Sequence, residues 1–398
     1  MKTDSNRVTR NSLFLPSLVV SNFAAGPITI LIALLLVDMS KTFSTSVSVM
    51  GQINTSYSIA AFVFALLMGA LSIRFNHKSL LVSGLLLIGV SALGCFLAPD
   101  FITILAFYSL SGIGYSMVVP MTFALIGEHY PLEKRANAVG WVIAAQSLVY
   151  VVGAPVIAIM SELGGWRFSI IGFVIPVLVT GLMLVFFGTA FASASRQASA
   201  NGEGYVASFR EILLNRSAVA CLTGDMLRSA AFTSIMVYAI SFAKQQFLVS
   251  TDFASLILLA GALCYALGSL ASGSFVNRIG RKPSVIITAL LSGAFVAVYY
   301  SAPSLWISVV LILVAGWFFG MTASAANSLT LEQVPKLRGT MMSVDSAVVS
   351  LGSAIGTAVG GLALFYSDYQ GLGSVLGTMG ILAAVVFGLL AKDPVKKQ

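Results

Sequence analysis

The chain of 398 residues is far more apolar than a soluble protein: 58% of its residues are hydrophobic, 9% are charged and the mean hydropathy is +0.96. Soluble domains carry about 25% charged residues. The formal net charge of +8 could suggest nucleic acid, but such binding needs a basic face on a soluble surface. The composition therefore indicates a membrane protein and argues against a nucleic-acid partner.

Apolar runs follow one another along the whole chain. A bilayer core about 30 Å thick is crossed by roughly 20 apolar helical residues. Strand-type alternation is absent, so the runs predict helices. The first run is too long and unpunctuated for a cleavable leader, so we expect it to be retained. We predict twelve spans, at about 13–37, 48–73, 79–98, 101–127, 136–160, 168–191, 217–243, 253–276, 283–302, 304–331, 339–366 and 371–391.

The basic residues predict the orientation of these spans. If the N-terminus is cytoplasmic, 18 of the 22 Lys and Arg residues fall in cytoplasmic segments. The loops on the other side hold Lys41, Arg167 and Lys244, and Arg228 is the one cation within a span. Cytoplasmic segments of membrane proteins carry an excess of Lys and Arg. We therefore predict an inner-membrane protein with both termini in the cytoplasm.

The longest polar stretch divides the twelve spans into six and six. Residues 192–216 begin with Ser, Ala and Gly, which is typical of a flexible linker. The stretch ends in "SFREILLNRS", which could form a short amphipathic helix on the membrane surface. We predict an N-terminal six-helix bundle at 1–191 and a C-terminal one at 217–398.

The two halves share a repeat at an offset of 204 residues. It aligns "GALSIRFNHK" at Gly69 with "GSFVNRIGRK" at Gly273. The same offset aligns the glutamates and prolines of "EHYPLEKR" and "EQVPKLRG". Equal spacing in both halves predicts two related bundles of the same orientation.

These motifs carry a family resemblance that covers essentially the whole chain. "GSFVNRIGRKP" resembles the loop between the second and third helices of each half in major facilitator superfamily transporters. "GGWRFSI" and "LLVDMSKTFSTS" are similar to stretches of that superfamily, especially of its drug-proton antiporters. The resemblance implies an all-α membrane protein of two pseudo-symmetric six-helix bundles. It also implies conformational-switch loops, formed here by Gly69, Arg74 and Lys78, and by Gly273, Asn277, Arg278, Gly280, Arg281 and Lys282.

The chain departs from the family pattern at several positions. The acid of the loop motif is replaced by Ile73 and Asn277, and Tyr108 and Ser111 stand where many relatives carry Arg and Gln. The loop must reverse the chain within a few residues, so we expect Gly280 and, in the first half, Asn76 to be left-handed. Because the second loop keeps its glycine and all its basic residues, we expect it to matter more for switching.

Other chemistry is sparse. The three cysteines lie in spans, where single thiols are usually packing residues. No metal-ligand spacing, nucleotide loop or nucleophile elbow is present. We therefore expect no cofactor, no metal and no enzymatic activity. Gly352, Gly356 and Gly360 form a stripe that predicts close helix packing, or alternatively a sliding contact between the halves.

The segment "CLTGDMLRSA" places two charges inside the seventh span. At about 1.5 Å per residue, Asp225 lies about 12 Å and Arg228 about 16 Å deep. Asp345 is a further acid within a span. A structural ion pair would neutralise Arg228, whereas a functional site would bind substrate or a proton. The first half offers neutral polar candidates within its spans: Asn22, Asn54, Tyr57, Tyr115 and Gln146.

We predict a secondary active transporter that moves a small organic solute by alternating access, with proton-coupled efflux as the first hypothesis. Asp225 or Asp345 would exchange the proton. One alternative is uptake or exchange of an anionic metabolite with Arg228 as counter-ion; another is a non-transporting receptor with the same fold. The expected partners are the solute, protons and membrane lipids, and we expect the protein to function as a monomer.

Overall fold

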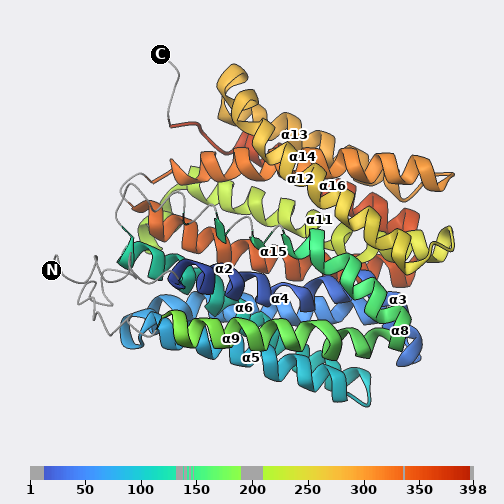
Figure 1. Ribbon diagram of the computed structural model, residues 1–398. Coiled ribbons are helices and arrows are strands. Elements are labelled where there is room, and N and C mark those ends of the chain that lie inside the picture. Colours follow the sequence, from blue (N-terminus) through green and yellow to red (C-terminus); the bar gives the residue numbers. More distant parts are fainter. Residues whose placement is uncertain are drawn as a thin grey trace.

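The computed structural model describes residues 13–130, 138, 141–142, 145–146, 148–189, 209–334 and 337–394, without the side chains of 69–70, 72–74, 127, 338–340 and 343. Within these residues the chain is helical throughout, with short connections (Figure 1). This confirms the predicted all-α membrane fold.

The described part of the first half consists of α-helices and two short π-helices. They are α2 (Phe14–Ala25), α3 (Pro27–Thr42), α4 (Val47–Arg74), α5 (His77–Leu97), α6 (Phe101–His129), the π-helix η1 (Val149–Gly153), α8 (Ala154–Ser169), the π-helix η2 (Ile170–Val174) and α9 (Ile175–Gly188).

The second half forms the remaining labelled helices. They are α11 (Arg216–Gln246), α12 (Thr251–Ile279), α13 (Arg281–Tyr299), α14 (Leu305–Leu331), α15 (Arg338–Tyr366) and α16 (Tyr369–Leu389). Residues 209–214 form a further helical turn, in the segment for which the sequence predicts a short helix.

Eleven helical stretches of the described residues are long and apolar enough to cross a membrane. One of them, Val149–Gly188, has 40 residues, about twice the length that a single crossing needs. Gly164 and Gly165 interrupt it, and Gly165 has a φ of 78°. The Ser169 hydroxyl donates a hydrogen bond to the Ile157 carbonyl, at 3.0 Å, so the two arms lie side by side. This stretch is a hairpin of two spans, which agrees with the predicted twelve.

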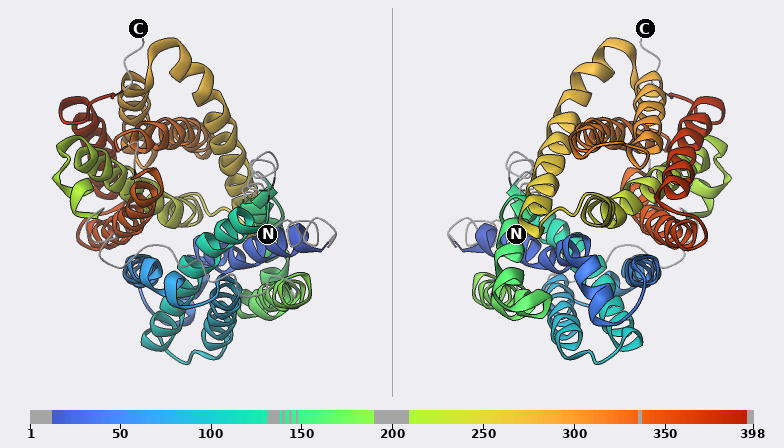
Figure 2. Two further views of the ribbon diagram at one scale, coloured as in Figure 1. Left: turned by 90° about the vertical axis from the view of Figure 1, so that its left-hand side faces the viewer. Right: turned by 90° about the vertical axis from the view of Figure 1, so that its right-hand side faces the viewer.

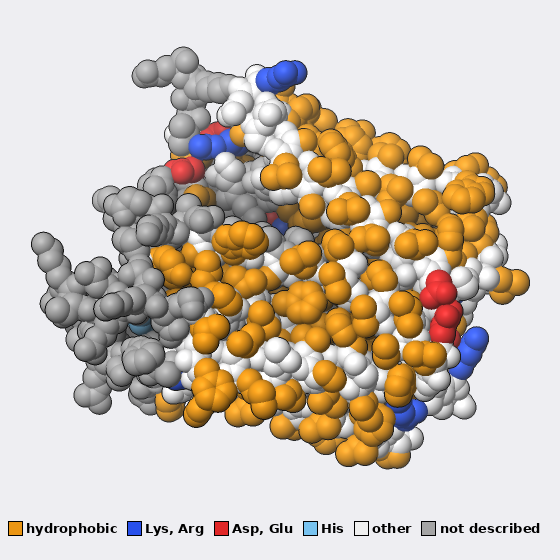
Figure 3. All heavy atoms as spheres, viewed as in Figure 1, with side chains coloured by type: hydrophobic (Ala, Val, Ile, Leu, Met, Phe, Trp, Pro, Cys, Tyr) orange, Lys and Arg blue, Asp and Glu red, His pale blue; other side chains and the backbone are white. Residues whose placement is uncertain are grey.

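The helices run between two ends of the molecule. The proximal end, where α2 begins and α16 ends, carries the turns between α4 and α5 and between α12 and α13 (Figure 1). The distal end carries the turns between α3 and α4, α11 and α12, and α15 and α16. Figure 3 shows a surface that is largely hydrophobic between the ends, with Lys, Arg, Asp and Glu side chains near the ends. An apolar band of this kind fits the hydrocarbon core of a bilayer.

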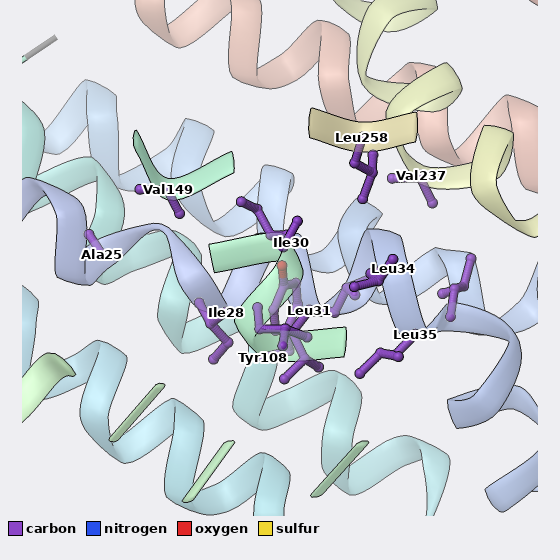
Figure 4. Packing of buried hydrophobic residues seen from close by; sticks show 14 of the residues in the cluster. Ala25, Ile28, Ile30, Leu31, Leu34, Leu35, Tyr108, Val149, Val237 and Leu258 are labelled. Carbon is purple, nitrogen blue, oxygen red and sulfur yellow. The ribbon is translucent and has the colours of Figure 1, made fainter. Parts of the chain in front are cut away.

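The two halves form separate groups of helices (Figure 2). They share one hydrophobic core toward the middle and the distal end. Ile30, Leu31 and Leu34 of α3 lie there with Tyr108 of α6, near Val237 and Leu258 of the second half (Figure 4). The precise bundle boundaries stay a prediction, because residues 190–208, which include most of the predicted linker 192–216, lie outside the described residues.

Polar contacts join the halves toward the distal end. Gln52 Nε2 on α4 donates to the Ala358 carbonyl on α15, at 3.4 Å, and the hydroxyls of Thr55 and Thr357 lie 2.9 Å apart. The Lys244 ammonium on α11 lies 2.6 Å from an Asp38 carboxylate oxygen on α3. We call these contacts the distal seam.

The proximal part of the second half packs on itself. Two further hydrophobic clusters, one around Phe387 and Leu329 and one around Met341 and Val344, contain described residues of the second half alone. Among the described residues, therefore, the hydrogen bonds and ion pair between the halves lie at the distal seam, and the proximal clusters do not bridge the halves. The molecule is closed at its distal end.

The glycine stripe on α15 packs within the second half. A Cβ at Gly352 would clash with the Met226 carbonyl oxygen, and one at Gly356 would clash with that of Ala230, both on α11. Gly360 faces Tyr238, Ser234 and Leu372. The prediction of close helix packing is confirmed. The alternative, a sliding contact between the halves, is wrong for these three residues, because their neighbours all belong to the second half.

The Asp38–Lys244 pair should hold the distal end closed. The Lys244 side chain is only 8% accessible, and Lys244 also donates to the Thr251 hydroxyl at 3.0 Å. We expect Asp38→Asn to weaken closure by about 1 kcal/mol. The measurement is the rate at which a maleimide labels Thr357→Cys, in a background without the three native cysteines. We expect this rate to rise about 5-fold.

The charge-exchanged double variant, Asp38→Lys with Lys244→Asp, is the control, and it should return the labelling rate toward that of the parent. An unchanged rate in Asp38→Asn would show that the pair does not contribute to closure.

Candidate functional site

A buried charged cluster lies in the second half, at the proximal side of the shared core. Arg228 Nε donates to Asp225 Oδ1 at 2.9 Å, and the Thr330 hydroxyl of α14 donates to Asp225 Oδ2 at 3.1 Å. The Asp225 side chain is fully buried and that of Arg228 is 9% accessible. Three-residue spacing on α11 puts both charges on one helix face, and the structure brings them together, as in the first of the two alternatives open from the sequence.

Asp345 joins this cluster from α15. It is 3% exposed, and the charges of both Asp225 and Arg228 act on its carboxyl group. Its Oδ1 atom is buried without a hydrogen-bond partner among the described residues. The cluster therefore holds two carboxyl groups for one guanidinium. Leaving one charge of such a group uncompensated in a low-dielectric interior is strongly unfavourable.

Thr330 is a member of this cluster that the sequence analysis missed. Hydroxyl residues are frequent in these spans, and nothing in their spacing distinguishes the one that reaches Asp225. The contact between α11 and α14 belongs to the tertiary structure, which cannot be predicted from the hydropathy of the sequence.

A neutral hydrogen-bonded group lies in the first half. Asn22 Nδ2 on α2 donates to the Thr122 hydroxyl on α6 at 2.7 Å, and Gln146 Nε2 donates to Asn22 Oδ1 at 3.4 Å. Asn22 is 2% exposed and Thr122 is fully buried. The structure thus brings two predicted residues, Asn22 and Gln146, together with Thr122, which the prediction lacked. Asn22 is thus buried and hydrogen-bonded, and its role at a substrate or proton site stays a prediction.

The helices around this group are interrupted. Helix α2 ends at Ala25, and α3 restarts at Pro27, whose ring lacks the N–H of a regular helix. A Cβ at Gly26 would lie 2.7 Å from the Val149 side chain, so glycine allows the close approach of η1. The π-helix η1 in turn shifts the register of its span.

Tyr115 belongs to a different group, an aromatic one. Its ring lies 6.5 Å from that of Tyr57, and Tyr57 lies 5.3 Å from Tyr108. Tyr57 and Tyr115 are partly accessible, whereas Tyr108 is buried. Asn54, also on α4, is 8% exposed, and its amide nitrogen lacks a partner among the described residues. The neutral candidates therefore divide into a bonded group around Asn22 and a tyrosine group around Tyr57.

A shallow groove of about 450 Å³ lies elsewhere, between α4 and α6. Its lining includes Gln52 and Thr55 of the distal seam, with Ser56 and Leu105, and it has no charged residue. No group of three or more His, Cys, Asp or Glu side chains in the described part of the chain could hold a metal ion. The charged cluster therefore remains the main candidate for chemistry.

Comparison with known proteins agrees with this architecture. The sequence profile of the Major Facilitator Superfamily matches residues 18–244 and 226–398. The chain belongs to the Major Facilitator Superfamily. It is therefore a multi-pass membrane transporter, and its family implies a small-molecule substrate.

This facilitator is only distantly similar in sequence to the following three proteins. It is 21% identical to the uncharacterized MFS-type transporter YwfA of Bacillus subtilis (strain 168), over 93% of this chain and 90% of that protein. It is 24% identical to Multidrug resistance protein 2 of the same organism, over 81% of each chain. A bacterial homolog of the human lysosomal transporter Spinster, in an inward-facing and occupied conformation, has the same fold. Its TM-score is 0.74 at 16% identity, over 94% of this chain and 95% of that one.

The second-half switch loop of this facilitator turns at a glycine. Gly280 has φ 96° and ψ 163°, a conformation essentially restricted to glycine, and it separates α12 from α13. The prediction of a left-handed Gly280 is confirmed in the sign of φ. Gly273, Asn277 and Arg278 are exposed at the proximal end of α12, and Arg281 and Lys282 are partly exposed in the first turn of α13.

The first-half loop is built differently. The prediction of a left-handed Asn76 is wrong, because its φ is −66°: it caps α5 and accepts a hydrogen bond from the Lys78 backbone. Lys78 Nζ donates to the Thr189 carbonyl at 3.0 Å. His77 lies 2.8 Å from Glu128, the glutamate of the repeat. The surroundings of Gly69 and the side chain of Arg74 lie outside the described part, so the predicted role of these residues stays untested.

Gly280 gives a stability prediction with a matched control. Gly280→Ala should lower the free energy of unfolding by about 1–3 kcal/mol, because an L-residue is strained at this φ and ψ. Gly273→Ala should be neutral or slightly stabilising, because Gly273 is helical and open space surrounds its Cβ position. Thermal unfolding of the purified variants measures both. Equal melting temperatures would contradict the structure of this turn.

The charged cluster gives a second stability prediction. Asp225→Asn should cost about 3–5 kcal/mol, because it strands the buried Arg228 guanidinium. Adding Arg228→Gln should restore most of that loss. Asp345→Asn should cost far less, since it preserves the Asp225–Arg228 bond. Denaturation of the purified variants tests this order, and an Asp345→Asn variant as unstable as Asp225→Asn would contradict it.

Proposed function

We propose that this facilitator exports a small organic solute in exchange for protons, by alternating access of its two bundles. The observation that carries the proposal is the buried pair of carboxyl groups, Asp225 and Asp345, beside one guanidinium. Asp225 is held by Arg228 and Thr330. Asp345 has an oxygen without a partner among the described residues. Asp345 is therefore the group assigned to the transported proton.

The charge balance supports this assignment. With both acids ionised the cluster carries one net negative charge, and an uncompensated buried charge is costly. With a proton on Asp345 the cluster is neutral. Release of the proton, which returns the Asp345 carboxylate, requires water or a solute that alters the charge around Arg228. Proton and solute then affect one another's binding, which is a requirement for coupling.

The orientation of the molecule is part of the same proposal. The excess of basic residues near the proximal end supports a cytoplasmic location for that end and for both termini, in the inner membrane. With the distal seam closed, the described state is then open toward the cytoplasm. A relative named multidrug resistance protein is in keeping with export. We retain the predicted action as a monomer as part of the proposal.

The proposal predicts proton movement that depends on Asp345. Purified protein in liposomes that contain a fluorescent pH indicator is challenged with ethidium, benzoate or glucose. We expect at least one of these probes to change the internal pH. We expect Asp345→Asn to abolish that change while it retains exchange of the same labelled probe across the membrane, because exchange needs no net proton transfer.

Asp368→Asn is the matched control. Asp368 is an exposed N-cap of α16, and asparagine can accept the same hydrogen bond from Gly371. This variant should behave as the parent. Solute flux without proton movement in the parent protein would refute coupling. Binding of a probe without flux would favour the alternative of a receptor.

A further inference from the structure

Tyrosines extend from the first half to the charged cluster. Tyr115 lies near Tyr57 in the first half, and Tyr150 of η1 is within electrostatic reach of Tyr115 and of Tyr265 in the second half. Helix α12, which carries Tyr265, packs directly against η1. Elements of both bundles that carry tyrosines therefore pack against each other at the boundary between the bundles.

Tyr265 leads to Arg228. The Tyr265 ring lies 5.1 Å from Phe232, which is one helical turn beyond Arg228 on α11. At about 1.5 Å per residue, Arg228 lies about 18 Å and Tyr265 about 21 Å from the proximal ends of their helices. The ring and the guanidinium thus lie at similar depths.

These tyrosines have unused binding capacity. Tyr115, Tyr150 and Tyr265 are each partly accessible, although their helices pack from both sides. Within the described part of the chain, no hydrogen bond of their hydroxyl groups to protein is recorded, whereas Tyr238 and Tyr299 of the second half each donate to a carbonyl. Partly accessible rings near the boundary between the bundles offer flat surfaces to a ligand.

The charge that a ligand would meet is positive. The Arg228 side chain is 9% accessible, whereas that of Asp225 is fully buried and Asp345 is 3% exposed. The bond to Asp225 uses Nε, so the terminal nitrogens of the guanidinium are available. A guanidinium fork binds carboxylates through two parallel hydrogen bonds.

We propose that the solute is an aromatic carboxylate, bound with its carboxylate on Arg228 and its ring between Tyr150 and Tyr265. The proposal rests on the proposed transport only in placing this site on the solute pathway. Aromatic pairs gain about 0.5–1.5 kcal/mol beyond the burial of their area.

Other solute classes fit less well. An aromatic cation would be attracted to the tyrosine faces but repelled by the accessible guanidinium. A neutral sugar could use the phenol hydroxyls but would not form the paired, charge-assisted hydrogen bonds that a carboxylate forms with the terminal nitrogens of Arg228. The combination of a flat aromatic wall with a single accessible cation favours a planar anion.

The test is equilibrium binding to the purified full-length protein in lipid nanodiscs. Labelled benzoate, 4-hydroxybenzoate and indole-3-acetate serve as probes. We expect at least one to bind. Ligands that lack the aromatic ring or the negative charge should compete weakly. We expect cyclohexanecarboxylate to bind about 2- to 10-fold more weakly than benzoate. We expect the cation benzylamine and the neutral sugar glucose not to displace the bound probe.

Variants separate the ring from the charge. Tyr265→Leu should weaken binding about 2- to 10-fold, and Tyr265→Phe should leave stacking intact. Arg228→Lys keeps a positive charge beside Asp225, so the protein should still fold, but loss of the fork should weaken carboxylate binding about 10-fold. Tyr366→Leu is the matched control, because Tyr366 is 81% exposed at the distal end of α15; its binding should equal that of the parent.

Three results would overturn the proposal: no binding of any of the three probes, displacement by benzylamine or glucose, or equal binding in Tyr265→Leu and the parent. The result of the binding experiment does not depend on whether transport is coupled to protons. If no aromatic carboxylate binds while another solute moves protons, the proposed function stands and the substrate class is wrong. If one binds without proton movement, the substrate class stands and the coupling is wrong.

Discussion

A guanidinium buried among membrane helices must be neutralised where it lies, and much of the second half is arranged around that requirement. Arg228 meets Asp225 on its own helix, and Asp225 meets Thr330 on α14. Asp345 adds a second acid from α15. These contacts fix α11, α14 and α15 about one point. Glycines then let α15 approach α11 to backbone distance. A polar requirement and small residues together determine how these helices pack.

The fold could be predicted because the bilayer imposes strong rules on sequence. Span length, the absence of alternation and the basic bias each follow from the cost of exposing polar groups to hydrocarbon. The repeat at Gly69 and Gly273 then predicted two related bundles. Asp225 and Arg228 were found for the same reason: charges within an apolar run stand out, and their spacing puts them on one helix face.

What could not be predicted is which faces meet. Asn22 and Thr122 are a hundred residues apart, and Tyr150 and Tyr265 come from different bundles. Hydropathy is nearly uniform around these helices, so no apolar stripe shows which side packs against protein and which faces lipid. The error at Asn76 has a local cause. Asparagine favours both left-handed turns and N-caps, and here the bond from the Lys78 backbone selects the cap.

The distal seam and the charged cluster have different energetic roles. The seam consists of partly exposed hydrogen bonds and one ion pair, Lys244 with Asp38. Such contacts contribute about 0.5–1.5 kcal/mol each, so opening them needs only a few kcal/mol. The cluster is far costlier to break, because separation would strand buried charges. A solute or a proton can shift a conformational equilibrium only by its difference in affinity for the two states. Because the seam contacts are weak and the charged cluster lies elsewhere, the halves can part at the distal end while the cluster stays intact. The difference in affinity that a solute or a proton must supply to open the seam is therefore small.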